Sequence, residues 1–190
     1  MLARTAMSSF SDAHELVEIP IIAANLHRLM LSGQSQIWAV LHQGDSDQRL
    51  AYSLAATFLG RMCLSGEIAK LSKAQWELVQ RAIKFYRQVA PVIKHGTSRC
   101  FGELGESWRN PKGWQAIVRT STDEYFALIV IHTFANAPGQ IEIPLPKSPW
   151  KIAGQFSADG TGKAIFSGST LRVETGSDFR GQVFRLRHAA

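Results

Sequence analysis

The chain has 190 residues, 45% of them hydrophobic, and a net charge of +6, which suits a folded protein of one domain or two small ones. Its basic residues form no run of five or more and no zinc-finger spacing, so we expect no nucleic-acid partner. Its apolar runs fall short of the ~20 residues that span a bilayer, and residues 1–20 lack a signal-peptide pattern, so we expect no membrane association and a cytoplasmic location.

The first candidate site residue is Asp12, in the segment from Ser9 to Glu15. It ends a short apolar segment and precedes a helix-like one. A carboxylate between a strand and a helix can face a cleft beside a helix N-terminus, which suits general acid/base chemistry. Asp is also a favoured N-cap residue, so helix capping is the competing interpretation of Asp12.

Residues 19–66 are predicted to alternate between helices and strands. Pro20 opens a helical spacing of apolar residues that runs from Ile19 to Leu31. The run from Gln36 to Leu41 is nearly continuous in apolar residues, which is typical of a strand buried on both faces in a parallel sheet. A second buried run, from Arg61 to Gly66, is predicted as the next strand.

Two further helices are expected. The first lies between these strands, with Asp45 or Asp47 as its N-cap, and the second begins at Ser72, which forms a capping-box pair with Gln75. Two apolar stripes give the second helix a broad packing face, and Pro91 is predicted to mark its end. The inward-facing residues of the first helix are Leu50, Leu54 and Phe58.

Beyond Gly96 the pattern changes to short segments rich in β-branched and aromatic residues, separated by turn clusters. Such segments without a helix between them predict an antiparallel β-sandwich, with a boundary near His95 to Ser98. The predicted strands are Trp114 to Thr120, Tyr125 to Phe134, Ile141 to Leu145, Trp150 to Phe156, Lys163 to Ser167, Leu171 to Thr175 and Gln182 to Arg187.

The first half has too few strands to close a sheet, because a strand buried on both faces needs neighbours on each side. The predicted fold class is therefore α/β plus all-β. Residues 1–96 would be the last strand-helix units of an incomplete (β/α)8 barrel, the C-terminal part of a catalytic barrel, and residues 97–190 an antiparallel β-sandwich. A compact α/β domain of unusual topology is the alternative.

Several stretches resemble melibiase-type α-galactosidases, the retaining glycoside hydrolases of family 36. Met1-Leu2 followed by Ser11-Asp12 resembles the M-L…W-T-S-D stretch around the acid/base of that family. The segment from Phe58 to Ser65 resembles G-T-L-G-Y-E-L-D-L-S, its final barrel strand.

A third stretch begins at Leu71-Ser72 and runs through Phe85-Tyr86 to Gly96, and it is similar to the family pattern L-S-x-E-E…I-x-x-Y-K…L-I-x-x-G. The resemblance covers residues 1–96 by motif. It covers the rest by architecture, because the barrel of the family is followed by a C-terminal β-sandwich.

The resemblance implies that Asp12 is the general acid/base, which protonates the departing glycosidic oxygen and then activates water. Ser11 and His14 would contact the substrate, a small carbohydrate, although a capping serine and a solvated histidine are the alternatives. No cofactor and no metal ion are expected.

The chain also departs from the family. Ala13-His14-Glu15 replaces Asp/Asn-Thr-Asp-Ala after the Ser-Asp pair, and Arg61 to Leu64 replaces the carboxylates of the final strand. The Lys-Trp-Asp-like motif that carries the nucleophile does not occur, and Asp45 and Asp47 are better explained as helix caps. We therefore expect a fragment of a retaining glycoside hydrolase for α-galactosides or related glycosides, inactive alone and prone to self-association through the incomplete barrel.

Two other functions fit the residues. One is a non-catalytic β-sandwich module with a helical neck that binds carbohydrate or protein, which requires an N-terminal half without an exposed sheet edge. The other is a small complete hydrolase that uses Asp12 and Glu15 as its carboxylate pair.

Overall fold

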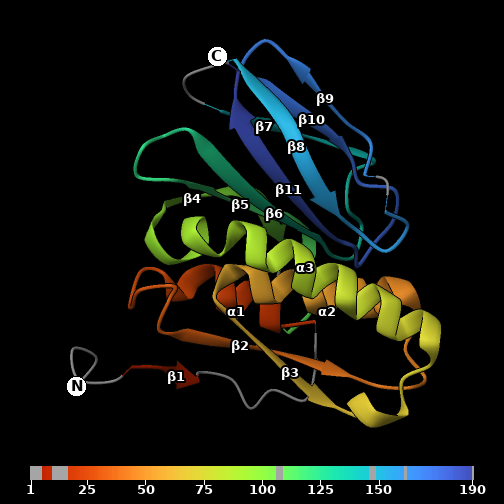
Figure 1. Cartoon of the computed structure of the whole chain (residues 1–190). Coiled ribbons are helices and arrows are strands. Elements are labelled where there is room, and N and C mark those ends of the chain that lie inside the picture. The colour runs from red at the N-terminus through yellow and green to blue at the C-terminus, as the bar shows by residue number, and fades with distance from the viewer. Residues whose placement is uncertain (1–5, 10–16, 106–108, 146–148, 161, 190) are drawn as a thin grey trace.

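The computed structural model describes residues 6–9, 17–105, 109–145, 149–160 and 162–189, and these residues form four successive layers (Figure 1). A three-stranded parallel sheet is followed by a layer of helices, a five-stranded sheet and a second three-stranded sheet. Most strands therefore lie in antiparallel sheets, as predicted for the second half of the chain.

The parallel sheet consists of β1 (Ser8–Ser9), β2 (Ser35–Leu41) and β3 (Arg61–Gly66), in the order β1-β2-β3. In β2 the residues that face the helices are buried and those on the other face are half-buried, so the predicted burial on both faces is wrong. The strand β3 is half-buried to exposed, also against expectation. The buried residues of β2 are Ser35, Ile37, Ala39 and Leu41, and the half-buried ones are Gln36, Trp38 and Val40.

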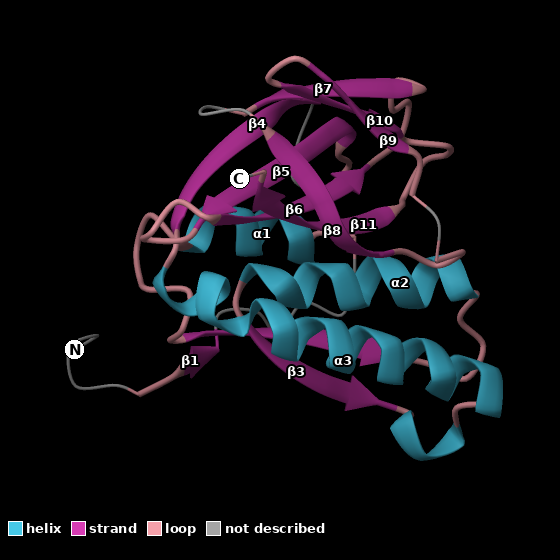
Figure 2. Cartoon of the chain, turned by 45° about the horizontal axis from the view of Figure 1, so that its top comes forward, coloured by secondary structure: helices cyan, strands magenta, loops and turns pink. Residues whose placement is uncertain are grey.

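The helical layer consists of α1 (Ile19–Leu26), α2 (Asp47–Ala56) and α3 (Lys73–His95), with short 3₁₀ turns at Thr57–Leu59 and Ile68–Lys70. Figure 2 shows these helices between the parallel sheet and the antiparallel strands. Within the described residues, no helix combines the length and the apolar character that crossing a membrane requires.

The helix ends confirm one expectation and correct three. The capping box of Ser72 and Gln75 is present at the start of α3. The N-cap of α2 is Ser46, whose hydroxyl accepts a hydrogen bond from the amide of Arg49 at 3.2 Å, so neither predicted aspartate fills that role. The helix α1 ends at Leu26 instead of Leu31, and α3 continues through Pro91 to His95. Burial of Val92 and Ile93, beyond the proline, holds this last turn in place.

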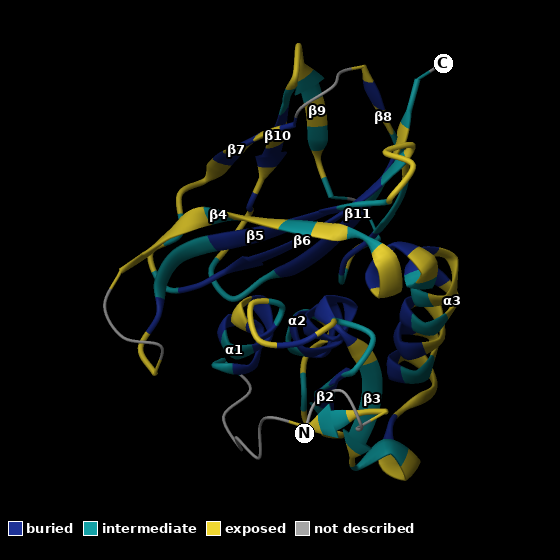
Figure 3. Ribbon diagram, turned by 90° about the vertical axis from the view of Figure 1, so that its left-hand side faces the viewer, coloured by how far each residue is buried: buried dark blue, intermediate teal, exposed yellow. Residues whose placement is uncertain are grey.

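The helical layer is buried from both sides (Figure 3). One continuous core contains residues of all three helices, of β2 and of the five-stranded sheet. Leu54, Phe58 and Val79 are fully buried in it, as are Val130 and Val183 from the sheet. Burial on two sides explains why α3 carries a broad apolar face instead of a narrow stripe.

The second half of the chain is an antiparallel sandwich. The five-stranded sheet has the order β4-β5-β6-β11-β8, the small sheet has the order β7-β10-β9, and a second apolar core lies between them. All seven predicted strands are present, and the structure adds an eighth, β4. The bounds are β4 (Thr97–Gly105), β5 (Lys112–Thr120), β6 (Phe126–Thr133), β7 (Gln140–Pro144), β8 (Trp150–Phe156), β9 (Ala164–Ser167), β10 (Thr170–Glu174) and β11 (Gly181–His188).

The buried guanidinium of Arg119, on β5, joins the five-stranded sheet to the helical layer. It donates hydrogen bonds to the carbonyl of Ile93 in the last turn of α3 at 3.3 Å and to the carbonyl of Leu59 at 3.1 Å. A third bond runs to the Ser98 hydroxyl on β4 at 2.8 Å. The negative end of the α3 dipole favours a cation there, and although burial lowers the pKa of Arg119 to about 10, the group is charged at neutral pH.

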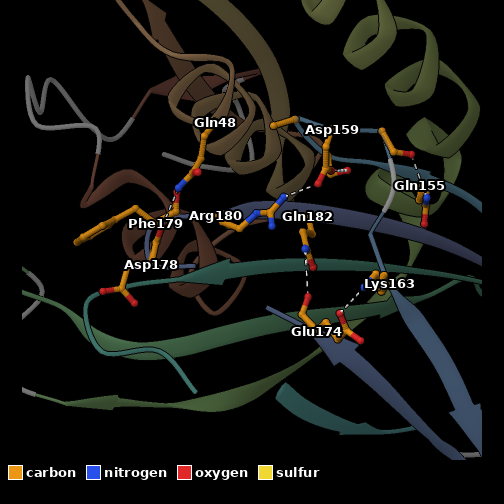
Figure 4. Close-up of polar contacts among 12 residues, drawn as sticks. Gln48, Gln155, Asp159, Lys163, Glu174, Asp178, Phe179, Arg180 and Gln182 are labelled. Atoms are coloured by element: carbon orange, nitrogen blue, oxygen red, sulfur yellow. Dashed lines mark hydrogen bonds and ion pairs between the residues drawn. The ribbon is translucent and has the colours of Figure 1, made fainter. Parts of the chain in front are cut away.

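A second polar joint connects α2 with the loop before β11 (Figure 4). The Gln48 side-chain amide donates a hydrogen bond to the carbonyl of Asp178 at 2.8 Å. The Asp178 carboxylate accepts hydrogen bonds from the amides of Asn136 and Ala137, both at 3.0 Å. This joint orders the β6–β7 and β10–β11 connections against the start of α2.

His132, on β6, is fully buried beneath α2. Its Nε2 lies 3.1 Å from the carbonyl oxygen of Tyr52, and because a carbonyl can only accept, Nε2 carries the proton. Nδ1 has no hydrogen-bond partner among the described residues, which fits a neutral ring. Desolvation lowers the pKa of His132 to about 4.

We expect this histidine to make the fold sensitive to mild acid. Its pKa is about 4 in the folded chain and 6.5 as a free side chain, so between these values the unfolded state binds the extra proton and stability falls as the pH falls. The loss is about 3 kcal/mol once the pH is below 4. Urea unfolding between pH 4 and pH 7 should show a flatter pH dependence for His132→Gln than for the wild type. His95→Gln, at an exposed position, should keep the wild-type dependence; equal slopes for all three proteins would contradict the assignment.

Candidate functional site

The candidate site is the carboxyl edge of the parallel sheet, defined here as the ends of its strands and the loops that follow β2 and β3. The strands β2 and β3 run in the same direction and end together, at the right of Figure 1. Parallel strands place the loops after their carboxyl ends at one edge, where ligands of α/β folds bind. The loops bring His42 and Asp45 after β2 together with Glu67 and Lys70 after β3.

Glu67 is the central group of this edge. Its carboxylate accepts a hydrogen bond from the Lys70 ammonium at 2.7 Å and another from the amide of Gln43 at 3.3 Å. The Nδ1 atom of His42 lies 3.7 Å from its second oxygen. These contacts, that of Lys70 first, hold the pKa of Glu67 below its ordinary value, so the group is a fixed anion at neutral pH. Its side chain is 37% exposed and can accept hydrogen bonds from a hydroxyl-bearing ligand.

Asp45 closes the loop after β2. Its carboxylate accepts a hydrogen bond from the amide of His42 at 2.8 Å, and its own amide donates to the carbonyl of His42 at 3.0 Å. The Gln75 side chain binds the same loop through the carbonyls of Gln43 and Asp45, both at 3.0 Å. Asp45 therefore acts within the loop and Asp47 lies in the first turn of α2, so neither is the helix cap that the sequence predicted.

The end of β1 is held by Trp38. The indole Nε1 donates a hydrogen bond to the Ser9 hydroxyl at 2.6 Å, across the parallel pair of β1 and β2. Both groups lie on the sheet face that no described helix covers. This contact fixes the last described residue before the segment that contains Asp12.

The three residues that the sequence proposed as a site, Asp12, Ser11 and His14, lie outside the described residues. The structure instead adds His42 and Glu67, which sequence reasoning missed. A usable signal was present, because both residues come immediately after predicted parallel strands. Among the described residues, no group of three or more His, Cys, Asp or Glu side chains is arranged to hold a metal ion.

No family model and no curated protein matches this sequence, but solved structures do. The GH36 alpha-galactosidase AgaA from Geobacillus stearothermophilus matches with a TM-score of 0.69 and 20% identity, over 94% of this chain and 25% of that chain. An alpha-galactosidase from Lactobacillus brevis matches with a TM-score of 0.68 and 15% identity, over 95% and 26%. An alpha-amylase from H.orenii matches with a TM-score of 0.54 and 12% identity, over 97% and 49%.

The comparison confirms, at the level of the fold, the expected likeness to a C-terminal segment of GH36 alpha-galactosidases. The match lies in the C-terminal part of those longer chains, and this chain spans about a quarter of their length. Identities of this size establish a shared fold and leave the activity to be argued from the site.

The structure predicts that Lys70 controls the titration of Glu67. Replacing Lys70 with Met removes the hydrogen bond and the adjacent positive charge, so the pKa of Glu67 should rise toward its ordinary value. Carboxyl ¹³C NMR titration of the wild type and of K70M measures the change. The Lys73→Met variant, at the exposed start of α3, is the matched control and should leave the Glu67 titration where it is. An unchanged curve in K70M would show that the contact does not form in solution.

Proposed function

We propose that this chain is the C-terminal part of a retaining glycoside hydrolase that acts on α-galactosides or related glycosides. Residues 1–96 would supply the last strand-helix units of a (β/α)8 barrel, and residues 97–190 its C-terminal β-sandwich. One observation carries the proposal: the helices among the described residues cover a single face of the parallel sheet, within an architecture shared with GH36 structures. In a closed barrel the outer face of each strand packs on helices and the inner face fills the interior.

The surface of β2 and β3 that no described helix covers, called the open face here, has the character expected of a barrel interior. Cross-strand pairs place Trp38 beside Cys63 and Val40 beside Ser65. These side chains are half-buried although no described element covers them. The strands β1 and β3 are the edges of the described sheet, so each has a side on which further parallel strands could pair.

The proposed mechanism assigns the proton transfers to Asp12. Asp12 follows the last residue of β1 by three positions in the sequence. As an acid it would protonate the glycosidic oxygen, and as the conjugate base it would activate the water that releases the glycosyl group from the nucleophile. Ser11, His14, His42 and Glu67 would bind sugar hydroxyls around it.

The nucleophile would come from a strand outside this chain. Retaining hydrolysis needs a second carboxyl group about 5–5.5 Å from the first. Among the described residues of the carboxyl edge, Asp45 closes its own loop and Glu67 is bound by Lys70. The chain alone should therefore not turn over a glycoside.

The alternative, a non-catalytic binding module with a helical neck, requires an N-terminal half without an exposed sheet edge. The described sheet has two edge strands, β1 and β3, and one face without helices. This arrangement favours the barrel proposal over the module.

A chimera tests the assignment of Asp12. Replacing the C-terminal quarter of AgaA with this chain should give an enzyme that hydrolyses raffinose and nitrophenyl α-galactoside. Asp12→Asn should reduce kcat/KM for raffinose by about 10²–10⁴-fold. It should reduce the nitrophenyl rate less, because that leaving group departs without a proton from the enzyme.

Asp47→Asn, which alters a carboxylate in the first turn of α2, is the control for the chimera and should retain activity. Equal losses on the two substrates, or Asp12-dependent hydrolysis by the chain alone, would contradict the proposed division of roles.

The open face also predicts self-association of the isolated chain. Val40 is half-buried there, and an uncovered apolar sheet face favours pairing between copies. Light scattering should show the wild type above monomer mass and Val40→Lys closer to it, because a charge on this face opposes burial. Ile165→Lys is the matched control, since Ile165 is 66% exposed on β9, and it should behave as the wild type. A monomeric wild type would count against the open face as an association surface.

A further inference from the structure

The sandwich leaves a cavity at one end, because a three-stranded sheet lies over a five-stranded one. The cavity has a volume of about 240 Å³ and lies over β4 and β5, between the β5–β6 turn and the facing ends of β7 and β8. Its lining combines apolar side chains with hydroxyl and charged groups. The lining includes Thr97, Arg99, Phe101, Val118, Thr120 and Trp150.

Strand register places these side chains on one face of the sheet. Thr97 pairs with Thr120 and Arg99 with Val118 across β4 and β5. Their sequence neighbours Ser98 and Arg119 point the other way and form the joint to the helical layer. Thr97 and Arg99 are thus exposed on the cavity side of β4 and take no part in that joint.

The lining has an apolar floor and solvent-accessible polar groups at the rim. Phe101, Val118 and Trp150 pack on the sandwich core and provide the floor. The hydroxyls of Thr97, Thr120 and Thr122 make no hydrogen bond to any described residue, and Arg99 forms no ion pair within that part of the chain. Donors and acceptors around an aromatic surface form a site for an amphipathic ligand.

We propose that this cavity binds one pyranose unit of a neutral oligosaccharide. A pyranose ring has an apolar face that packs on an aromatic ring and equatorial hydroxyls that bind threonine hydroxyls and a guanidinium. Four of the lining residues, Thr97, Thr120, Ser121 and Thr122, carry hydroxyl groups and two are charged, so the lining suits a neutral, hydroxyl-bearing ligand. The volume equals that of about eight water molecules, which suits a single ring.

This site is separate from the proposed catalytic edge. The cavity lies on the sandwich side of the five-stranded sheet, whereas the carboxyl edge lies beyond the helical layer. It would hold a polysaccharide or oligosaccharide near the enzyme without taking part in hydrolysis. Sugar binding in this cavity therefore does not depend on the role proposed for Asp12.

Backbone NMR titration of the full chain with raffinose, and separately with maltose, tests the proposal. We expect saturable shifts for residues 97–101 and 118–124, at the millimolar affinity of a small exposed site. Phe101→Ala and Arg99→Ala should each weaken binding about tenfold. The matched controls Leu104→Ala, at an exposed position on the same strand, and Arg172→Ala, at an exposed arginine on β10, should bind as the wild type.

The two sugars identify the ligand, since stronger binding of raffinose indicates a galactoside and stronger binding of maltose a glucan. The proposal is overturned if no saturable shifts occur, if glycerol gives the same shifts, or if both cavity variants bind like the wild type. Shifts confined to residues 42–46 and 67–71 would also overturn it, while supporting a sugar site at the carboxyl edge. Arg99 is exposed, so its variant keeps the fold and reports on the site even where Phe101→Ala unfolds.

Discussion

The rest of the structure depends on a helical layer that is buried between two sheets. Its apolar residues pack against β2 on one side and against the five-stranded sheet on the other. This packing joins the two halves of the chain through one continuous core. Arg119 adds the polar part of this joint, because its guanidinium satisfies carbonyls of α3 and of the turn at Leu59 that burial would otherwise leave unpaired.

This joint between the two halves supports two surfaces of different character. On one side it supports the parallel sheet, whose carboxyl edge gathers His42, Glu67 and Lys70. On the other side it supports the sandwich, whose small sheet leaves Phe101 and Arg99 uncovered. The buried neutral His132 lies within the joint itself, so mild acid should act on both halves together.

Sequence patterns predicted the elements well where a periodic apolar face decides the structure. The capping box at Ser72 and the strand from Trp150 to Phe156 have the expected positions. The sequence patterns gave wrong predictions where a single proline or a polar edge strand determines the local structure. Pro91 does not end α3, because buried residues beyond it hold the last turn, and β4 was missed because it is a polar, glycine-containing edge strand paired on one side.

The amino-acid sequence by itself determined the alternation of strands and helices, the change to an all-β second half and the likeness to a GH36 C-terminal segment, since local periodicity and motif order are properties of neighbouring residues. Only the tertiary structure decided which face of β2 is covered, and it alone brought Glu67 to His42 and Arg119 to Ile93. These contacts join residues far apart in the chain, and their geometry follows from strand register and packing between layers, which no local pattern records.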